Sequence, residues 1–216
     1  MKYQALLFDL DNTLMDFSKS EEDAIYNTFT KFDIEHSEEN IKLYEAKNHY
    51  CWDQVEKGEL KVKDLASLRF YLFLNELKID RDHNLLAKDF IEELAKGTYL
   101  MPYALEVVKE LSQKYKIAIV SNGISYIQNK RLDNSLLKPY IDKRYISEDL
   151  DVAKPDPLFF AYPIKEYGSN LLVIGDSYKS DVVGARNAGL DCIYYSKEKD
   201  KDVETIDDLR ALLTML

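Results

Sequence analysis

Reactive side chains lie where short apolar runs of this 216-residue chain end, or in the connection between two such runs. They form four groups, which are Asp9-Leu10-Asp11-Asn12-Thr13, Ser121-Asn122-Gly123, Lys154-Pro155, and Gly175-Asp176-Ser177 with Asp181 a few residues later. Several carboxylates that converge on one lysine repel one another unless a cation is also bound. The residue types in these groups therefore predict a reaction that a metal ion assists.

The ligand atoms in these groups are oxygens, which suit a hard cation. Mg²⁺ usually takes one or two carboxylates in proteins, together with waters and phosphate oxygens of the substrate. Zinc is not indicated, because the sequence has no cluster of histidines and cysteines. The three histidines are His36, His49 and His83, which all lie outside the four groups. We therefore expect Mg²⁺ as the cofactor.

Phosphoryl transfer is a reaction that such groups can catalyse, because it needs an in-line nucleophile and stabilisation of negative charge. A carboxylate can be the nucleophile through an aspartyl-phosphate. A second carboxylate two residues further along can protonate the leaving oxygen and then activate water. Ser121 can donate a hydrogen bond to a phosphate oxygen and Lys154 can neutralise its charge. The main-chain amides around Asn122 can add donors at the start of a helix.

The apolar runs that precede these groups predict the fold. They cover residues 3–8, 117–120, 171–174 and 192–195, with a weaker run at 145–146. Continuous apolar runs of this length are typical of parallel strands that are buried on both faces. Helical patterns lie between them, and we expect helices over about 156–167 with Pro155 in the first turn and over about 206–216 with a shared apolar face.

Strands that alternate with helices indicate a doubly wound, Rossmann-like α/β domain. In such a domain ligands bind beyond the carboxyl ends of the strands, and the four reactive groups, at strand ends or in a connecting loop, would converge there. Residues 17–97 break this alternation, since they contain only amphipathic stretches, and Ser37 with Asn40 is a helix-start pattern. We therefore predict an α/β core domain of residues 1–16 and 98–216, interrupted by an all-helical cap domain of residues 17–97.

The four groups occur together and in the order found in haloacid dehalogenase superfamily phosphatases, which this chain resembles over nearly the whole predicted core. The resemblance implies Asp9 as the nucleophile and Asp11 as the general acid and base. It also implies a magnesium ion held by Asp9, Asp176 and the main-chain oxygen of Asp11. Asp181 would orient Lys154 or a metal-bound water, and the helical insertion would be a cap that closes over the substrate.

Within that superfamily the chain is similar to the pyrimidine 5′-nucleotidases. The similar segments are Asn48-His49-Tyr50-Cys51-Trp52, Glu56-Lys57-Gly58-Glu59-Leu60, and Val152-Ala153-Lys154-Pro155 after Ile146-Ser147-Glu148. The similarity implies a pyrimidine nucleoside monophosphate as the substrate. Trp52 is the residue that we expect to contact the base, because an aromatic ring can stack on it. A packing position inside the cap is the alternative for this side chain.

Composition limits the partners and the compartment. The net charge of −10 argues against polymeric nucleic acid, which needs a basic surface, but not against a small phosphorylated metabolite. No apolar run approaches the roughly 18 residues of a membrane span, and the first apolar stretch is too short for a signal peptide. Two cysteines form no disulfide framework. We expect a cytoplasmic protein with no membrane partner, either a monomer or a homodimer.

Alternative functions on the same fold must be compared with the nucleotidase. Other small metabolites, such as sugar phosphates or phosphoglycolate, are alternative phosphatase substrates. Dehalogenation is disfavoured by Asp11, because that chemistry needs no acid or base two residues after the nucleophile. A phosphosugar mutase stays open. A non-enzymatic scaffold would be expected to lack at least one motif residue, and this sequence retains Asp9, Asp11, Lys154 and Asp176.

Overall fold

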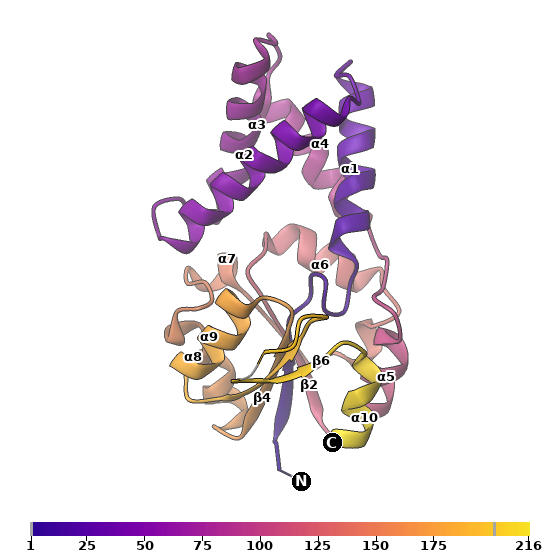
Figure 1. Cartoon of the computed structure of the whole chain (residues 1–216), viewed down its shortest axis with the longest axis vertical. Coiled ribbons are helices and arrows are strands. Elements are labelled where there is room, and N and C mark those ends of the chain that lie inside the picture. The colour runs from indigo at the N-terminus through magenta and orange to yellow at the C-terminus, as the bar shows by residue number, and fades with distance from the viewer. Residues whose placement is uncertain (1, 201) are drawn as a thin grey trace. The chain divides into compact units, whose positions relative to one another are not determined.

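The computed structural model describes residues 2–200 and 202–216, and the chain divides into two compact units. The first, here called the core unit, comprises Met1–Phe17 and Thr98–Leu216. The second, here called the helical unit, comprises Ser18–Gly97. Figure 1 colours the chain by residue number, so the helical unit can be followed from indigo to magenta between the two stretches of the core unit.

A six-stranded parallel sheet in the described residues forms the centre of the core unit, with strand order β3-β2-β1-β4-β5-β6. The strands are β1 (Ala5–Phe8), β2 (Lys116–Ser121), β3 (Lys143–Ile146), β4 (Leu171–Gly175), β5 (Asp191–Tyr195) and β6 (Glu204–Ile206). Strand β1 is central, since it pairs with β2 on one side and β4 on the other. All four of its side chains are buried, as a parallel strand with covered faces requires.

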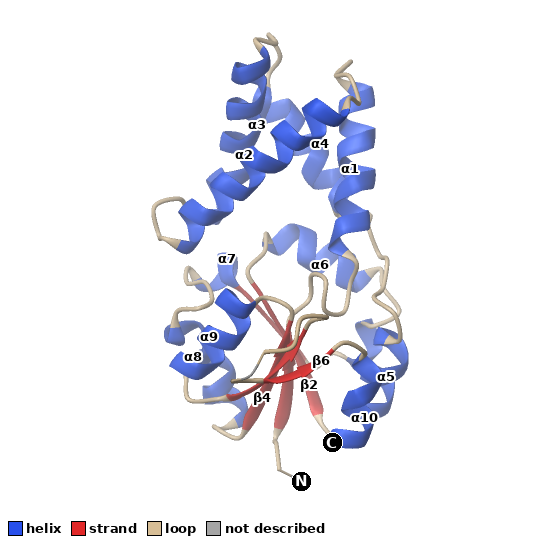
Figure 2. Ribbon diagram, in the orientation of Figure 1, coloured by secondary structure: helices blue, strands red, loops and turns tan. Residues whose placement is uncertain are grey.

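Helices cover both faces of this sheet (Figure 2). Side chains of β1 alternate between the faces, so that Leu6 and Phe8 pack with α5 (Ala104–Leu111) and α10 (Leu212–Met215). Ala5 and Leu7 pack on the other face with α8 (Pro157–Tyr167) and α9 (Val183–Asn187). The prediction of a doubly wound α/β fold with an all-helical insertion is confirmed.

The end of the chain differs from the helix predicted over 206–216. Ile206 belongs to β6, which pairs with β5, and a 3-10 helix η3 (Leu209–Ala211) and the short α10 follow. The predicted apolar face is nevertheless buried, because Ile206, Leu209 and Leu212 all join the same hydrophobic cluster. The free backbone edge of β5 explains the difference, because it pairs with three residues that an isolated pattern would assign to a helix.

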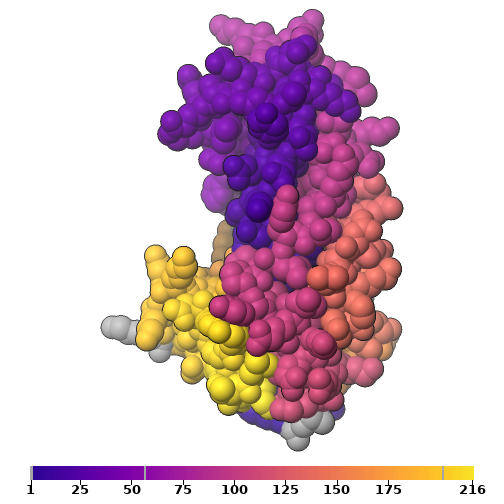
Figure 3. Space-filling view, turned by 90° about the vertical axis from the view of Figure 1, so that its right-hand side faces the viewer, coloured from indigo at the N-terminus to yellow at the C-terminus, as the bar shows by residue number. Residues whose placement is uncertain are grey.

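Two further details of the core unit bear on these expectations. The helix predicted over about 156–167 is α8, which begins at Pro157 with Asp156 as its N-cap, so Pro157 and not Pro155 occupies the first turn. The C-terminal segment, yellow in Figure 3, lies beside the magenta segment that includes α5. The C-terminal segment therefore packs as part of the core unit.

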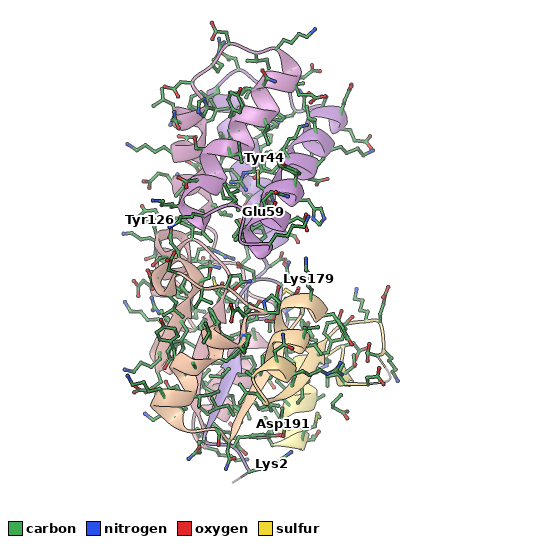
Figure 4. All side chains as sticks on the ribbon, turned by 90° about the vertical axis from the view of Figure 1, so that its left-hand side faces the viewer. Lys2, Tyr44, Glu59, Tyr126, Lys179 and Asp191 are labelled. Atoms are coloured by element: carbon green, nitrogen blue, oxygen red, sulfur yellow. The ribbon has the colours of Figure 1, made fainter. Side chains whose placement is uncertain are left out.

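The helical unit contains α1 (Phe17–Lys31), α2 (Glu38–Glu56), α3 (Val62–Leu77) and α4 (His83–Leu94), of which α1 begins at the last residue of the preceding core stretch. Buried aromatic rings hold these helices together, and Tyr44, labelled in Figure 4, contacts the rings of Phe29, Phe70 and Phe90. Ser37 caps α2 as predicted, since its side chain accepts from the Asn40 amide. No helix in the described parts of the chain is long and apolar enough to cross a membrane.

Candidate active site

Three of the reactive groups lie at the carboxyl ends of neighbouring strands. Asp9 follows β1, Ser121 ends β2, and Asp176 follows β4. Because β2, β1 and β4 are adjacent and parallel, these residues meet at one edge of the sheet. Figure 4 labels Lys179, just beyond β4, at this edge, and Asp191 at the opposite edge.

Lys154 links these strand ends through its ammonium group. The side chain is only 1% exposed, and Nζ donates to Asp9 Oδ1 at 2.7 Å, to Asp181 Oδ1 at 2.6 Å and to the carbonyl oxygen of Val120 at 2.8 Å. An ammonium has three N–H donors, so these acceptors satisfy it completely. The lysine predicted from the third group is therefore fixed beside the carboxylate predicted to be the nucleophile.

Asn122 holds the main chain of Lys154. Its Nδ2 donates to the Lys154 carbonyl at 2.7 Å, and its Oδ1 accepts from the Lys154 amide at 2.8 Å. This pair of hydrogen bonds orients the lysine peptide from the neighbouring strand end. The predicted contact with phosphate, which concerned the main-chain amides of this turn, stays a prediction.

Asp176 and Asp181 complete a group of carboxylates with Asp9. Carboxylate oxygens of the three residues lie within 4.8 Å of one another. Thr13 Oγ1 donates to Asp176 Oδ1 at 3.2 Å, and the Ser177 amide donates to Asp181 Oδ2 at 3.0 Å. These bonds hold the carboxylates in place from two different segments.

A π-helical turn, Tyr178–Val182, carries Asp181 back over the end of β4. The approach is so close that a Cβ at Gly175 would lie 2.2 Å from Asp181 Oδ2. Only glycine leaves this space without a shift of the carboxylate. The glycine of the fourth group is therefore required by packing at the site.

The electrostatics of this group are dominated by burial and by negative charge. Burial raises the pKa of Asp9 well above its usual range, although the charge of Lys154 opposes this effect. Burial and then the charge of Asp181 raise the pKa of Asp176 to about 6. Burial alone would lower the pKa of Lys154, but the charges of Asp181 and Asp9 outweigh it and raise that pKa above its usual value.

The three carboxylates fit a divalent cation. Together with Lys154 they leave an excess of negative charge in a buried place, which is costly without a further cation. Their oxygen atoms are the ligands that hard cations prefer. Burial first, and then the neighbouring carboxylates, raise the pKa values of Asp9 and Asp176, so a bound cation would favour their charged forms.

Asp11 contacts two residues that sequence analysis did not single out. Gln128 Nε2 donates to Asp11 Oδ2 at 2.6 Å, and Arg131 Nη1 donates to Asp11 Oδ1. Both come from α6 (Ser125–Asp133), and both are buried next to the apolar Ile127 and Leu132. Polar side chains on the apolar face of a helix are the signal that could have found them.

Trp52 belongs to the helical unit, whereas the site residues named so far belong to the core unit. It is half-buried and packs against a small hydrophobic cluster of Cys51, Val55 and Leu65. Its neighbour Tyr50 is exposed. Packing therefore accounts for part of the Trp52 side chain, and the predicted contact with a base stays a prediction.

A family comparison agrees with this fold and this arrangement of residues. The model of the haloacid dehalogenase-like hydrolases matches residues 3–189. The chain therefore belongs to the haloacid dehalogenase-like hydrolase family. The prediction of an enzyme of this phosphatase-containing superfamily is confirmed.

Curated relatives cover most of the chain. The HAD-hydrolase YfnB of Bacillus subtilis is 30% identical over 95% of this chain and 89% of its own length. The pyrimidine 5′-nucleotidase PynA of Streptococcus pneumoniae is 31% identical over 91% of this chain and 85% of its own length. The pyrimidine 5′-nucleotidase YjjG of Escherichia coli is 30% identical over 88% of this chain and 84% of its own length.

A solved structure is similar over the full length. The crystal structure of YfnB from Bacillus subtilis, bound to magnesium, superposes with a TM-score of 0.93 at 30% identity. The match covers 100% of this chain and 99% of that one. That crystal form of YfnB reveals interdomain movement.

Proposed function

We propose that this enzyme hydrolyses phosphate monoesters, with Asp9 as the nucleophile. The observation that carries the proposal is the bond from Lys154 Nζ to Asp9 Oδ1 at 2.7 Å. Lys154 thereby occupies one oxygen of the carboxylate, and within residues 2–200 and 202–216 the other oxygen, Oδ2, has no hydrogen-bond partner. Oδ2 is the atom that attacks phosphorus, while the ammonium offsets the charge of the incoming phosphate.

The proposed reaction has two steps. In the first, Asp9 Oδ2 bonds to phosphorus, the bond from phosphorus to the leaving oxygen breaks, and Asp11 gives that oxygen its proton. In the second, Asp11 takes a proton from a water molecule, whose oxygen attacks phosphorus and breaks the bond to Asp9. Inorganic phosphate, the free carboxylate of Asp9 and a protonated Asp11 result, so that the next turnover can begin. Ser121 donates a hydrogen bond to a phosphate oxygen throughout, and the nearby ammonium of Lys154 offsets the charge of the phosphate.

Mg²⁺ is the proposed cofactor, held by Asp9, Asp176 and the main-chain oxygen of Asp11. The all-oxygen ligand set and the excess of carboxylates over cations support this choice. When bound, the ion offsets the charge of the phosphate and of the carboxylates that surround it. Asp181 keeps the Lys154 ammonium pointed at Asp9 through its 2.6 Å contact.

Pyrimidine nucleoside 5′-monophosphates are the proposed substrates. Two relatives at about the same identity, PynA and YjjG, carry the name pyrimidine 5′-nucleotidase. We further propose that the helical unit is a cap that supplies the contacts to the base, with Trp52 among them. The part of the Trp52 side chain that packing leaves accessible supports a stacking contact.

The substrate is further proposed to be a free metabolite in the cytoplasm. The net charge of −10 disfavours a polymeric nucleic acid, because no excess of basic residues is available to neutralise its phosphates. The two cysteines are both free, which suits a reducing compartment. We propose a monomer or a homodimer as the working form.

Phosphate release from a panel of monoesters tests the substrate. The panel contains pyrimidine and purine 5′-monophosphates, sugar phosphates and phosphoglycolate at matched concentrations with Mg²⁺. We expect the highest kcat/KM for the pyrimidine monophosphates. Preference for sugar phosphates would keep the mechanism and reject the nucleotidase. Release of phosphate only in the presence of a sugar bisphosphate would favour a phosphosugar mutase.

Chelation of divalent cations is expected to stop hydrolysis, and added Mg²⁺ is expected to restore it. Binding to the native state alone also stabilises a protein, by about 2.7 kcal/mol when the ion is at 100 times its Kd. We therefore expect the Tm to rise with Mg²⁺ in the wild type and to rise much less in Asp176→Asn. Full activity in excess chelator, or the same Tm increase in both proteins, would reject the metal site.

A further inference from the structure

The proposed mechanism leaves two buried polar residues of α6 unexplained. Gln128 is 2% exposed and Arg131 is completely buried. Gln128 Nε2 lies 2.6 Å from Asp11 Oδ2 and 2.8 Å from Ser121 Oγ. Arg131 Nη1 donates to Asp11 Oδ1 and also to Gln128 Oε1 at 3.0 Å. Each oxygen of the Asp11 carboxylate thus has its own donor from this helix.

We propose that Gln128 and Arg131 are positioning residues, which hold the Asp11 carboxylate at the angle needed for proton transfer with the leaving oxygen. The inference rests on the proposed function, since it assumes that Asp11 is the general acid and base. It adds a role for α6, the helix after β2, which would orient the carboxylate of Asp11.

The need for such support follows from the place of Asp11 in the chain. Asp11 lies in a loop after β1, and the next residue, Asn12, has a left-handed backbone with φ 58°. The side chain is 28% exposed, so burial alone does not restrict its rotation. Two donors on two different oxygens restrict both of its side-chain dihedral angles, which one donor would not do.

The donors are themselves well fixed. The Arg131 guanidinium lies 5.6 Å from the centre of the Phe17 ring and is bound to Gln128. A Cβ at Gly123 would lie 2.5 Å from Gln128 Nε2, so the glycine of the second reactive group makes room for this amide. A fully buried guanidinium is costly unless a carboxylate pairs with it, and Asp11 is such a partner.

The dependence of kcat/KM on the leaving group of the substrate distinguishes a positioning role from a general effect on the stability of the fold. An alkoxide, such as that of a nucleoside, needs a proton as it leaves, whereas p-nitrophenolate leaves without one. Poor placement of a catalytic group costs about 10²-fold. A variant that misplaces Asp11 should therefore lose about 10²-fold in kcat/KM for an alkyl monoester and under about 10-fold for p-nitrophenyl phosphate. A general weakening of the fold would lower both values alike.

The experiment uses the full chain with Mg²⁺ and compares these two substrates in Arg131→Met, Arg131→Lys and Gln128→Ala. Lys130→Ala is the matched control, because Lys130 is an exposed cation on the same helix. We expect Arg131→Lys to recover part of the activity and Lys130→Ala to resemble the wild type. Loss of the Ser121 contact in Gln128→Ala affects both substrates, so the ratio of their kcat/KM values is the quantity compared.

A double-mutant cycle completes the test and covers the case in which Arg131→Met fails to fold. If Gln128 acts through Asp11, Gln128→Ala should change the alkyl-to-aryl ratio of kcat/KM little once Asp11→Asn is present. The same change of that ratio in both backgrounds, or equal losses for the two substrates, would overturn the inference alone. If the wild type hydrolyses no monoester, or if Asp11→Asn has no effect, the proposed function fails and the inference fails with it.

Discussion

Replacement of Asp9 by asparagine is expected to lower kcat on the order of 10⁵-fold or more, the scale seen when a nucleophile is removed. A carboxamide is nearly the same size as the carboxylate, but it is a poor nucleophile. Its oxygen can still accept from Lys154 Nζ, which lies 2.7 Å from Asp9 Oδ1. The fold should therefore be retained, and in excess chelator the removal of one buried carboxylate should leave the Tm unchanged or raise it.

Phosphate release and thermal unfolding of Asp9→Asn are measured beside two other variants. Asp207→Asn, an exposed aspartate in the loop after β6, is the control for the substitution itself. Asp11→Asn should lose about 10²- to 10⁴-fold, the usual contribution of a general acid or base. Turnover of Asp9→Asn close to that of the wild type would show that another residue is the nucleophile.

Replacement of Lys154 by methionine is expected to lower both activity and stability. Methionine keeps most of the side-chain volume but leaves Asp9 and Asp181 buried without the ammonium between them. Loss of one partner from a buried ion pair costs about 3–5 kcal/mol, and loss of a fixed donor at a reacting group costs about 10²- to 10³-fold in kcat. Urea unfolding in excess chelator measures the first effect, and phosphate release measures the second.

The pH dependence of this stability loss has a defined direction. Lys154 opposes the burial that raises the pKa of Asp9, so its removal should raise that pKa further. A carboxyl group whose pKa is higher in the folded than in the unfolded protein loses stability as the pH rises above the unfolded value of about 4. The free energy of unfolding of Lys154→Met should therefore lie closer to that of the wild type near pH 5 than near pH 7.

A second substitution tests whether buried charge or altered packing causes the loss of stability in Lys154→Met. Asp181→Asn in the Lys154→Met background removes one of the two unpaired carboxylates, so part of the lost stability should return without any return of activity. Asp207→Asn in the same background serves as the control. If stability does not recover, and if the loss is the same at both pH values, the cause is packing rather than buried charge.

Local sequence patterns were sufficient to predict the parallel strands of the core unit and the end of the sheet where the reactive groups meet. The apolar runs that end at Asp9, Ser121 and Gly175 predicted parallel strands, and burial on both faces is a property that each run displays by itself. The carboxyl ends of adjacent parallel strands must lie on one edge, so the convergence of the reactive groups followed from the fold class. Lys154 does contact Asp9 and Asp181, as expected for a lysine near these carboxylates.

Other features depend on contacts between distant segments, which no local pattern encodes. Ile206 is part of a strand because the edge of β5 is available to it, although its own spacing suits a helix. Asn122 is directed to the main chain of Lys154, 32 positions away in the sequence. Gln128 and Arg131 are 117 and 120 positions from Asp11, and their place beside apolar residues of a helix predicts burial but not the carboxylate that they contact.

The sequence predicts which faces are buried, but it does not predict which distant polar groups contact one another. Periodic apolar residues report that a face will be buried, and turns or strand ends report where the chain leaves the sheet. Which polar group meets a buried guanidinium depends on how α6 packs beside the loop after β1, and only the folded chain decides that. Sequence motifs therefore located the carboxylates and the lysine, while the tertiary structure supplied the two side chains that hold Asp11.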